Sequence, residues 1–413
     1  MASPQSGRLP VTVVTGFLGA GKTTLLRHLL LHSQRRLAVL VNEFGEVGID
    51  GDLLRSCGFC SDEELEGRLV ELANGCLCCT VQDDFLPTMQ ALLERGDQLD
   101  GILVETSGLA LPQPLLEAFQ WPQIRSSTWV SGVVAVVDGE ALAQGAVVAD
   151  PAALEAQRRA DPGLDHAAAI DELFEDQLAC ADLVLVSRAD RLGPEELEKV
   201  QQRVGPLVRD GTAVLPVARG AVNPELVLGL ASGAGEQAQG PGEAGEDPHH
   251  AEHDHHAEHE HHDHSHVAMQ SAALRLDGVL DRQALETRLL ELIRSHGLIR
   301  VKGRLRQPGK ARPLEIQAVG PRLESWYANP SDQASLAEPG LDLVVLGFAL
   351  QQEVLQAALE ALRTDLCGRI GREARRQTST SPQSRGRSPM AQIPSQQREA
   401  SCPQRACTVT QSV

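Results

Sequence analysis

The chain has 413 residues and a formal net charge of −19, from 37 Lys and Arg against 56 Asp and Glu. With 42% hydrophobic residues it has an ordinary globular composition, and its length suggests two domains with flexible segments. The acidic balance argues against a general nucleic-acid binder. No apolar stretch reaches the ~20 residues of a membrane-spanning helix, and residues 1–10 lack the apolar core of a secretory signal. We therefore expect a cytoplasmic protein with no nucleic-acid or membrane partner.

Short apolar runs alternate with helical segments through residues 8–232. The expected strands are Val11–Val14, Leu37–Val41, Leu69–Leu72, Gly101–Glu105, Gly132–Val137, Leu183–Val186 and Ala213–Val217. The expected helices include Thr23–His32, Asp84–Arg95, Glu172–Ala181 and Pro194–Val204. The strands are continuous Val, Leu and Ile runs, which is typical of parallel sheets covered on both faces. The pattern predicts an α/β domain over residues 1–232, with a doubly wound, mostly parallel sheet.

The remaining residues divide into a linker, a second domain and a tail. Residues 233–266 are acidic and rich in histidine, with ten of the 14 histidines within 249–266, and we expect a disordered linker there. Residues 267–368 predict a smaller α+β domain, and residues 369–413, rich in Arg, Ser and Pro, predict a disordered tail. The expected elements of the second domain are strands at Ala272–Leu276, Leu298–Leu305, Leu314–Val319 and Leu341–Leu346 and helices at Asp281–Ser295 and Gln351–Leu366.

A phosphate-binding motif follows the first strand. Residues Gly16–Thr23 read GFLGAGKT, which matches G-x-x-x-x-G-K-[ST] between a strand and a helix. Lys22 would reach the β- and γ-phosphates, and the Thr23 hydroxyl would bind Mg²⁺. Glu105 ends an apolar strand, as the carboxylate of a Walker B segment does, and is the second expected Mg²⁺ ligand and a catalytic residue. The other expected nucleotide-binding residues of this loop are Gly16, Gly19, Ala20, Gly21 and Thr24. The motif predicts a P-loop NTPase.

The base-recognition segment departs from the usual GTPase pattern, which is Asn-Lys-x-Asp after a late strand. This chain has Ser187-Arg188-Ala189-Asp190 directly after Leu183–Val186. Asp190 stands where the carboxylate would accept hydrogen bonds from guanine, and the Arg188 stem would lie against the base. Ser187 replaces the amide. We expect GTP as the nucleotide.

Two further groups of residues indicate metal binding. Cys76, Cys78 and Cys79 would hold one Zn²⁺ or Co²⁺ ion and leave a fourth position open, although three small buried residues in a tight turn are the alternative. Cys57 and Cys60 form a C-x-x-C pair whose role stays open. In the linker, the flexible histidines favour metal loading or storage over a defined site, and a solvated linker is the alternative. The auxiliary ligands expected there are His249, His250, His253, His255 and His256.

Taken together, these motifs resemble the CobW-type P-loop GTPases, a metallochaperone family. The matching stretches are GFLGAGKTT at 16–24, VNEFGEVGIDG at 41–51, ELANGCLCCT at 71–80, ILVETSGLA at 102–110, LRLDGVLDRQALE at 274–286 and GLIRVKGRL at 297–305. The resemblance implies that Glu43 and Asp50 lie in a catalytic switch segment, which couples the nucleotide to the C-x-C-C metal ligands. It also implies a CobW-type C-terminal domain.

The leading hypothesis is a GTP-hydrolysing metal chaperone that uses Mg–GTP. It would transfer Zn²⁺ or Co²⁺ from the C-x-C-C site to a client metalloenzyme or a protein of cobalamin biosynthesis, and a homodimer is possible. The first alternative is a P-loop kinase or ligase with a structural zinc ion. The second is a metal-buffering protein whose histidine run is its main feature.

Overall fold

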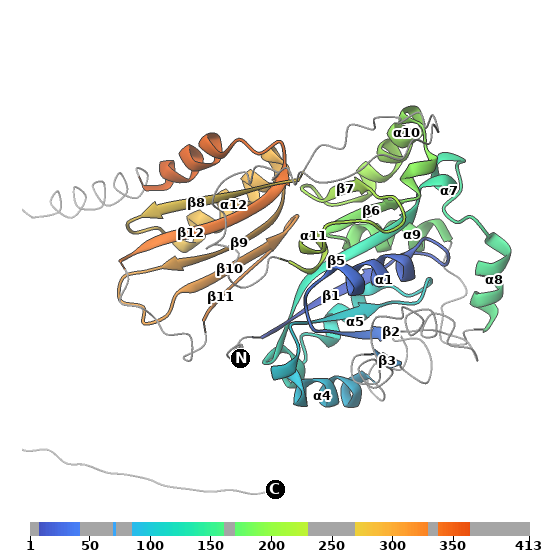
Figure 1. Ribbon diagram of the computed structural model, residues 1–413, viewed down its shortest axis with the longest axis horizontal. Helices are drawn as coiled ribbons and strands as arrows, with labels where there is room; N and C mark the ends of the chain where they lie inside the picture. Colours follow the sequence, from blue (N-terminus) through green and yellow to red (C-terminus); the bar gives the residue numbers. More distant parts are fainter. Residues whose placement is uncertain are drawn as a thin grey trace, which may run out of the picture. The chain divides into compact units, whose positions relative to one another are not determined.

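The computed structural model describes residues 8–41, 69–71, 85–160, 170–229, 269–328 and 338–363. Within them, the N-terminal domain contains a seven-stranded sheet in the order β3-β2-β4-β1-β5-β6-β7 (Figure 1). Every neighbouring pair is parallel, which confirms the predicted sheet. The strands are β1 (Leu9–Thr15), β2 (Leu37–Val41), β3 (Leu69–Glu71), β4 (Gly101–Glu105), β5 (Thr128–Asp138), β6 (Leu183–Ser187) and β7 (Ala213–Pro216).

Helices cover both faces of this sheet, as expected of a doubly wound domain. Leucines of α1 and α11 pack on one face, whereas apolar residues of α4, α5, α6, α9 and α10 pack on the other. The α-helices are α1 (Lys22–His32), α4 (Leu86–Glu94), α5 (Pro112–Ala118), α6 (Pro122–Arg125), α7 (Gly139–Ala143), α8 (Pro151–Ala160), α9 (Ile170–Cys180), α10 (Pro194–Val204) and α11 (Pro224–Leu228). Short 3₁₀ helices lie at η2 (Gly96–Gln98), η3 (Ala189–Arg191) and η4 (Gly205–Leu207).

Strand β5 is longer than the expected strand Gly132–Val137. It begins at Thr128, and all its residues are buried. The added residues pack against the second sheet, where the ring of Trp129 lies 5.1 Å from that of Trp326. This long-range contact explains why the local apolar pattern placed the start of the strand too late.

The C-terminal domain contains an antiparallel sheet in the order β11-β10-β9-β12-β8. Asp281 caps α12 (Arg282–His296) by accepting a hydrogen bond from the Ala284 N–H at 2.8 Å, and Gly297 ends this helix at φ 62°. β11 was not anticipated, because its sequence RLESWY is only half-buried and lacks an apolar run. The elements are β8 (Met269–Asp277), α12 (Arg282–His296), β9 (Leu298–Arg306), β10 (Leu314–Val319), β11 (Arg322–Tyr327), β12 (Gly340–Phe348) and a helix over 352–363.

The two sheets are joined by buried arginine contacts within one compact unit, residues 1–366. Arg300 of β9 is 3% exposed and donates hydrogen bonds to the backbone carbonyls of Leu226, Val227 and Ser131. This burial lowers the pKa of Arg300 to about 9, because desolvation penalises the charged form. Arg322 of β11 donates to the carboxylate of the fully buried Asp182 at 2.5 Å.

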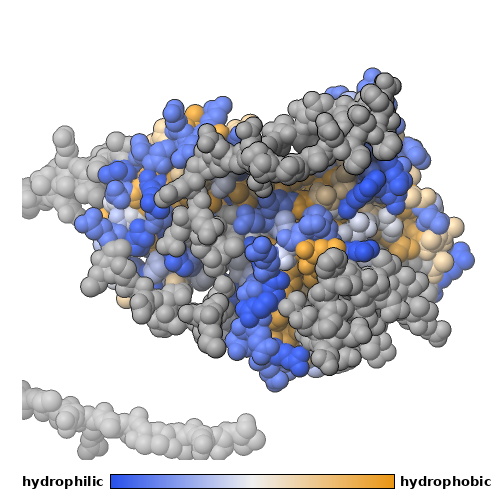
Figure 2. Space-filling model, viewed as in Figure 1, coloured by the Kyte–Doolittle hydropathy of each residue, from blue (hydrophilic) through white to orange (hydrophobic). Residues whose placement is uncertain are grey.

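The surface of the described residues mixes hydrophilic and apolar side chains, as Figure 2 shows for one face. Large apolar side chains are exposed among them only at scattered positions, namely Leu18, Leu31, Val279, Tyr327 and Val354. Among the described helices, none is both long and apolar enough to cross a membrane.

Candidate nucleotide-binding site

The loop between β1 and α1 has the backbone of a phosphate-binding loop. Gly16, Gly19 and Gly21 have φ angles of 135°, 75° and 105°, in the region that favours glycine. At Gly16 a Cβ would also overlap the carbonyl oxygen of Val136, so glycine is required there. Ala20 is buried, Thr23 is half-buried and Thr24 is exposed at the start of α1. Such a loop ahead of a helix N-terminus presents backbone N–H groups to an anion.

Lys22 and Glu105 lie next to each other at this end of the sheet, although they are 83 positions apart in the sequence. Lys22 is 7% exposed, and its Nζ donates hydrogen bonds to the carbonyls of Gly16 at 2.9 Å and Phe17 at 3.3 Å. The same Nζ lies 3.9 Å from the Oε1 of Glu105, which is 4% exposed. Their proximity follows from the pairing of β1 with β4, which places Val14 beside Glu105.

The loop after β4 is held by contacts with the end of β1, with the phosphate-binding loop and with α9. Thr106 donates from Oγ1 to the Oγ1 of Thr15 at 3.0 Å. A Cβ on Gly108 would come within 2.6 Å of the Leu18 nitrogen, so only glycine allows this close approach. Gln177 of α9 is buried and donates to the carbonyls of Gly108 at 3.1 Å and Ala110 at 3.2 Å. Sequence reasoning gave Gly108 and Gln177 no role. A polar residue on the buried face of α9 was the available signal for Gln177.

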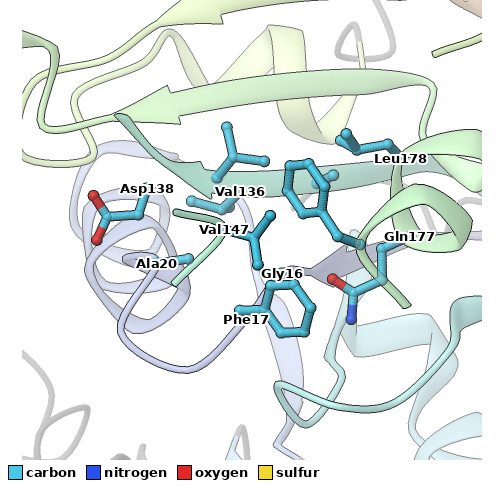
Figure 3. A pocket seen from close by; sticks show the side chains of 11 residues that line it. Gly16, Phe17, Ala20, Val136, Asp138, Val147, Gln177 and Leu178 are labelled. Carbon is cyan, nitrogen blue, oxygen red and sulfur yellow. The ribbon is translucent and has the colours of Figure 1, made fainter. Parts of the chain in front are cut away.

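A small cavity lies behind the phosphate-binding loop (Figure 3). Phe17 and Phe174 stack on one side of it, with ring centroids 6.0 Å apart. Asp138 and Ala20 lie on another side, near the start of α1 (Figure 3). Its lining is mostly apolar. The cavity therefore offers few polar groups that would bind a nucleotide.

The predicted base-recognition residues lie at the end of β6, beside the phosphate-binding loop. Ser187 is 7% exposed, and its Oγ would lie 3.7 Å from a Cβ at Gly21. Arg188 donates from Nη2 to the Gly19 carbonyl at 3.0 Å and from Nη1 to the Asp138 carboxylate. Asp190 lies in η3, and its Oδ2 is 3.9 Å from the Nε of Arg219. The Arg188 side chain thus contacts the P-loop directly, which the sequence did not indicate.

The remaining predicted site residues lie outside the described residues. They are Glu43 and Asp50 of the switch segment, Cys57, Cys60, Cys76, Cys78 and Cys79, and His249, His250, His253, His255 and His256 of the linker. Among the residues that the structure does describe, no group of three or more His, Cys, Asp or Glu side chains could hold a metal ion. The metal-ligand assignments therefore stay predictions.

Two family profiles match the chain, one for each domain. Residues 10–214 match the nucleotide-binding domain of CobW/HypB/UreG, and residues 269–363 match the C-terminal domain of the cobalamin synthesis protein cobW. The chain belongs to the CobW/HypB/UreG family. The family membership confirms the predicted resemblance and the prediction that the chain is a GTPase.

Curated relatives of this family member extend over most of its length. The zinc chaperone CobW of Pseudomonas aeruginosa is 46% identical over 364 residues, which are 87% of this chain and 92% of that protein. The zinc chaperone CobW of Sinorhizobium sp is 41% identical over 366 residues, which are 87% of this chain and 99% of that protein. The Zn(II)-bound YjiA GTPase from E. coli, a solved structure, is 23% identical and covers 86% of this chain and 99% of its own. Its TM-score is 0.35, so we draw no conclusion from that likeness.

Proposed function

We propose that this family member is a GTP-hydrolysing zinc chaperone, which binds Zn²⁺ at Cys76, Cys78 and Cys79 and transfers it to a client metalloprotein. The observation that carries the proposal is the buried approach of Lys22 Nζ to Glu105 Oε1, 3.9 Å, on a glycine-rich loop with phosphate-binding backbone geometry. The names of the two long relatives, both zinc chaperones, support zinc as the cargo.

For hydrolysis, the chain supplies charge and position. The Lys22 ammonium would neutralise the charge that develops on the transferred phosphoryl group, and the backbone N–H groups of the loop would hold the phosphates in place. Thr23 and Glu105 offer a hydroxyl and a carboxylate oxygen, which is the donor chemistry that Mg²⁺ prefers. When bound, Mg²⁺ would offset phosphate charge. We assign Glu43 and Asp50 to the switch segment that responds to the γ-phosphate.

Guanine recognition rests on the loop after β6. Asp190 is about one-third exposed at the site's edge, which leaves its carboxylate accessible to the N–H groups of a guanine ring. A carboxylate accepts from guanine but finds no equivalent pair of donors on adenine. The proposal therefore includes a preference for GTP over ATP, with Asp190 as the residue that sets it.

Zinc is the favoured cargo on chemical grounds as well. Three thiolates suit both Zn²⁺ and Co²⁺, but at equal availability the Irving–Williams order gives Zn²⁺ the higher affinity. Three thiolates also repel one another without a cation, so closing their loop around the ion requires a compensating interaction. An ordered switch segment would provide it in the GTP state, and hydrolysis would then release both the loop and the ion.

Zinc affinity measured in different nucleotide states tests this proposal. The protein is a variant that lacks residues 249–266, so that the linker histidines do not contribute, and zinc is titrated against a chelating indicator. We expect zinc to bind about 5- to 150-fold more tightly with Mg–GTP than with Mg–GDP, the usual range of allosteric couplings. By linkage, zinc must tighten Mg–GTP binding by the same factor. Equal zinc affinity with GTP, with GDP and without nucleotide would contradict the chaperone cycle.

Two controls separate the alternative functions. Replacing Cys76, Cys78 and Cys79 together with serine should remove the nucleotide-dependent zinc site and leave basal GTP binding in place. A tight zinc site that ignores the nucleotide would favour a kinase or ligase with structural zinc. Loss of nearly all zinc binding on deletion of 249–266 would favour a metal-buffering protein.

A further inference from the structure

Asp138 has no role in the function proposed above, yet it is a buried carboxylate at the edge of the nucleotide site. It ends β5 directly beside Ser187, the last residue of β6, and it is 3% exposed. Each of its oxygens has a defined partner: Oδ1 accepts from the Ala141 N–H at 3.2 Å, and Oδ2 accepts from Arg188. A buried carboxylate with a single guanidinium partner indicates that the position of that guanidinium matters.

Arg188 connects two loops that must both contact the nucleotide. Its Nη1 pairs with Asp138 and lies 3.6 Å from Glu140, while its Nη2 donates to the carbonyl of Gly19 in the phosphate-binding loop at 3.0 Å. Its backbone has a φ of 56°, a left-handed conformation that is costly for a residue with a Cβ and persists only where the surroundings hold it. The side chain and the backbone of Arg188 are therefore both fixed.

The Ser187 side chain does not connect the loop after β6 to the phosphate-binding loop. This side chain is buried next to Gly21, but the Ser187 Oγ has no hydrogen-bond partner within the described part of the chain. In the Asn-Lys-x-Asp pattern an amide occupies this position, and the serine hydroxyl makes no hydrogen bond to the described residues in its place. Gly139 keeps the ends of β5 and β6 close, because a Cβ there would lie 2.6 Å from the Ser187 carbonyl oxygen. Asp138 and Arg188 thus make the connection that Ser187 leaves out.

We propose that Asp138 is a positioning residue for nucleotide binding, which acts by holding the Arg188 guanidinium against the carbonyl of Gly19. The charged pair fixes the base-recognition loop, including Asp190, relative to the phosphate-binding loop. The ligand class is a guanine nucleotide. We expect GTP and GDP to be held alike, because the contacts of Arg188 with Asp138 and Gly19 are made between protein groups and do not require a γ-phosphate. The inference rests on the nucleotide site proposed above and adds the residue pair that sets its geometry.

The test replaces Asp138→Asn and Arg188→Gln, singly and together, in the full chain. Asparagine retains an oxygen for the Ala141 N–H and is a good N-cap residue, so Asp138→Asn removes the charge and keeps the cap. The matched control is Arg191→Ala, which removes the neighbouring exposed pair between Arg191 and Glu140, 3.1 Å. We expect each of the two single variants to raise the KM for GTP and the Kd for GDP by about tenfold or more, with kcat within about twofold.

Two readouts separate positioning from a loss of structure. The double variant should be no worse than the weaker-binding single variant, because both changes break one connection. The preference for GTP over inosine triphosphate, which lacks the exocyclic amino group, should also fall, because the loop that carries Asp190 is no longer fixed. Arg191→Ala should change neither quantity. Additive effects, an effect on kcat alone, or an unchanged KM with Asp138→Asn would each overturn the inference.

If one of the two single variants does not fold, the other still tests the inference. Arg188 is 35% exposed, so Arg188→Gln is the change that the fold tolerates better, and its KM and base preference test the same connection. Failure of the proposed function is also distinguishable. A parent protein that binds GTP and ATP equally would contradict guanine recognition, whereas the GDP affinity of the variants would still report on the Asp138–Arg188 pair.

Discussion

The two sheets of this chain place their charged residues in opposite ways. In the parallel sheet strands such as β4 and β5 are buried on both faces, and carboxylates stand where these strands end, as Glu105 does on β4 and Asp138 on β5. In the antiparallel sheet the charges run across one face. Its row consists of directly opposed residues on β8, β12, β9 and β10, namely Arg275, Asp342, Arg304 and Glu315.

This difference separates charges that can bind a ligand from charges that stabilise a sheet. The carboxyl edge of a parallel sheet gathers loops from several strands, so charges there can converge on a ligand. The charges in the row on the antiparallel sheet pair with one another, since Arg275 lies 3.5 Å from Asp342 and Arg304 lies 2.6 Å from Glu315. Cross-strand pairs of this kind mainly stabilise a sheet. We therefore expect substitutions at the first edge to change activity, and substitutions on the second face to change stability.

The largest effect should come from Lys22→Ala at the edge of the parallel sheet. Hydrolysis of GTP should fall about 10³-fold or more, because Lys22 is the cation of the phosphate-binding loop. Thermal unfolding should shift by only a few degrees, because the change removes no apolar core contact. Phosphate release and a melting curve measure the two quantities, with the exposed Lys199→Ala as control. Hydrolysis near the parent rate would mean that Gly16–Thr23 is not the phosphate site.

The second prediction concerns Arg300, which belongs to the charged face but is buried against α11. Arg300→Met removes hydrogen bonds to three backbone carbonyls and leaves them buried, which should lower the free energy of unfolding by about 2–4 kcal/mol. Arg275→Met is the matched control, because Arg275 lies on the same face of the sheet but its side chain is 73% exposed and that of its partner Asp342 is 43% exposed. Its expected cost is below about 1 kcal/mol. Equal losses in urea unfolding would show that the contact with α11 does not stabilise the protein.

The two sheets also show which features could be predicted from the sequence. The phosphate-binding loop and Glu105 were predictable, because a motif and an apolar strand each carry their meaning within a few residues. The Asp138–Arg188 pair was not predictable, because it joins residues 50 positions apart through the pairing of β5 with β6. In the same way, the alternation along β9 places Arg300 and Arg304 on one face. Only the docking of α11 decides which of them is buried.

The smallest predicted effect is a pH dependence centred on Lys302, between Arg300 and Arg304 on β9. Burial lowers the pKa of Lys302 to about 8 from its usual 10.5, as desolvation penalises the ammonium. The charged groups that face it are Glu315 and Glu225, which raise this pKa, and Arg35 and Arg304, which lower it.

The sign of the effect follows from proton linkage. Between pH 8 and 10.5 the unfolded chain keeps a proton on Lys302 that the folded chain has released, so unfolding takes up protons and stability rises with pH. Because the side chain is only partly buried, we expect a gain of about 1–2 kcal/mol, below the full shift at ~1.4 kcal/mol per pKa unit. Urea unfolding of the parent and of Lys302→Met across this range measures it. The difference between them removes the contribution of Arg300, whose pKa of about 9 acts in the same direction. A parent curve that runs parallel to that of Lys302→Met would show that the folded protein does not penalise this ammonium.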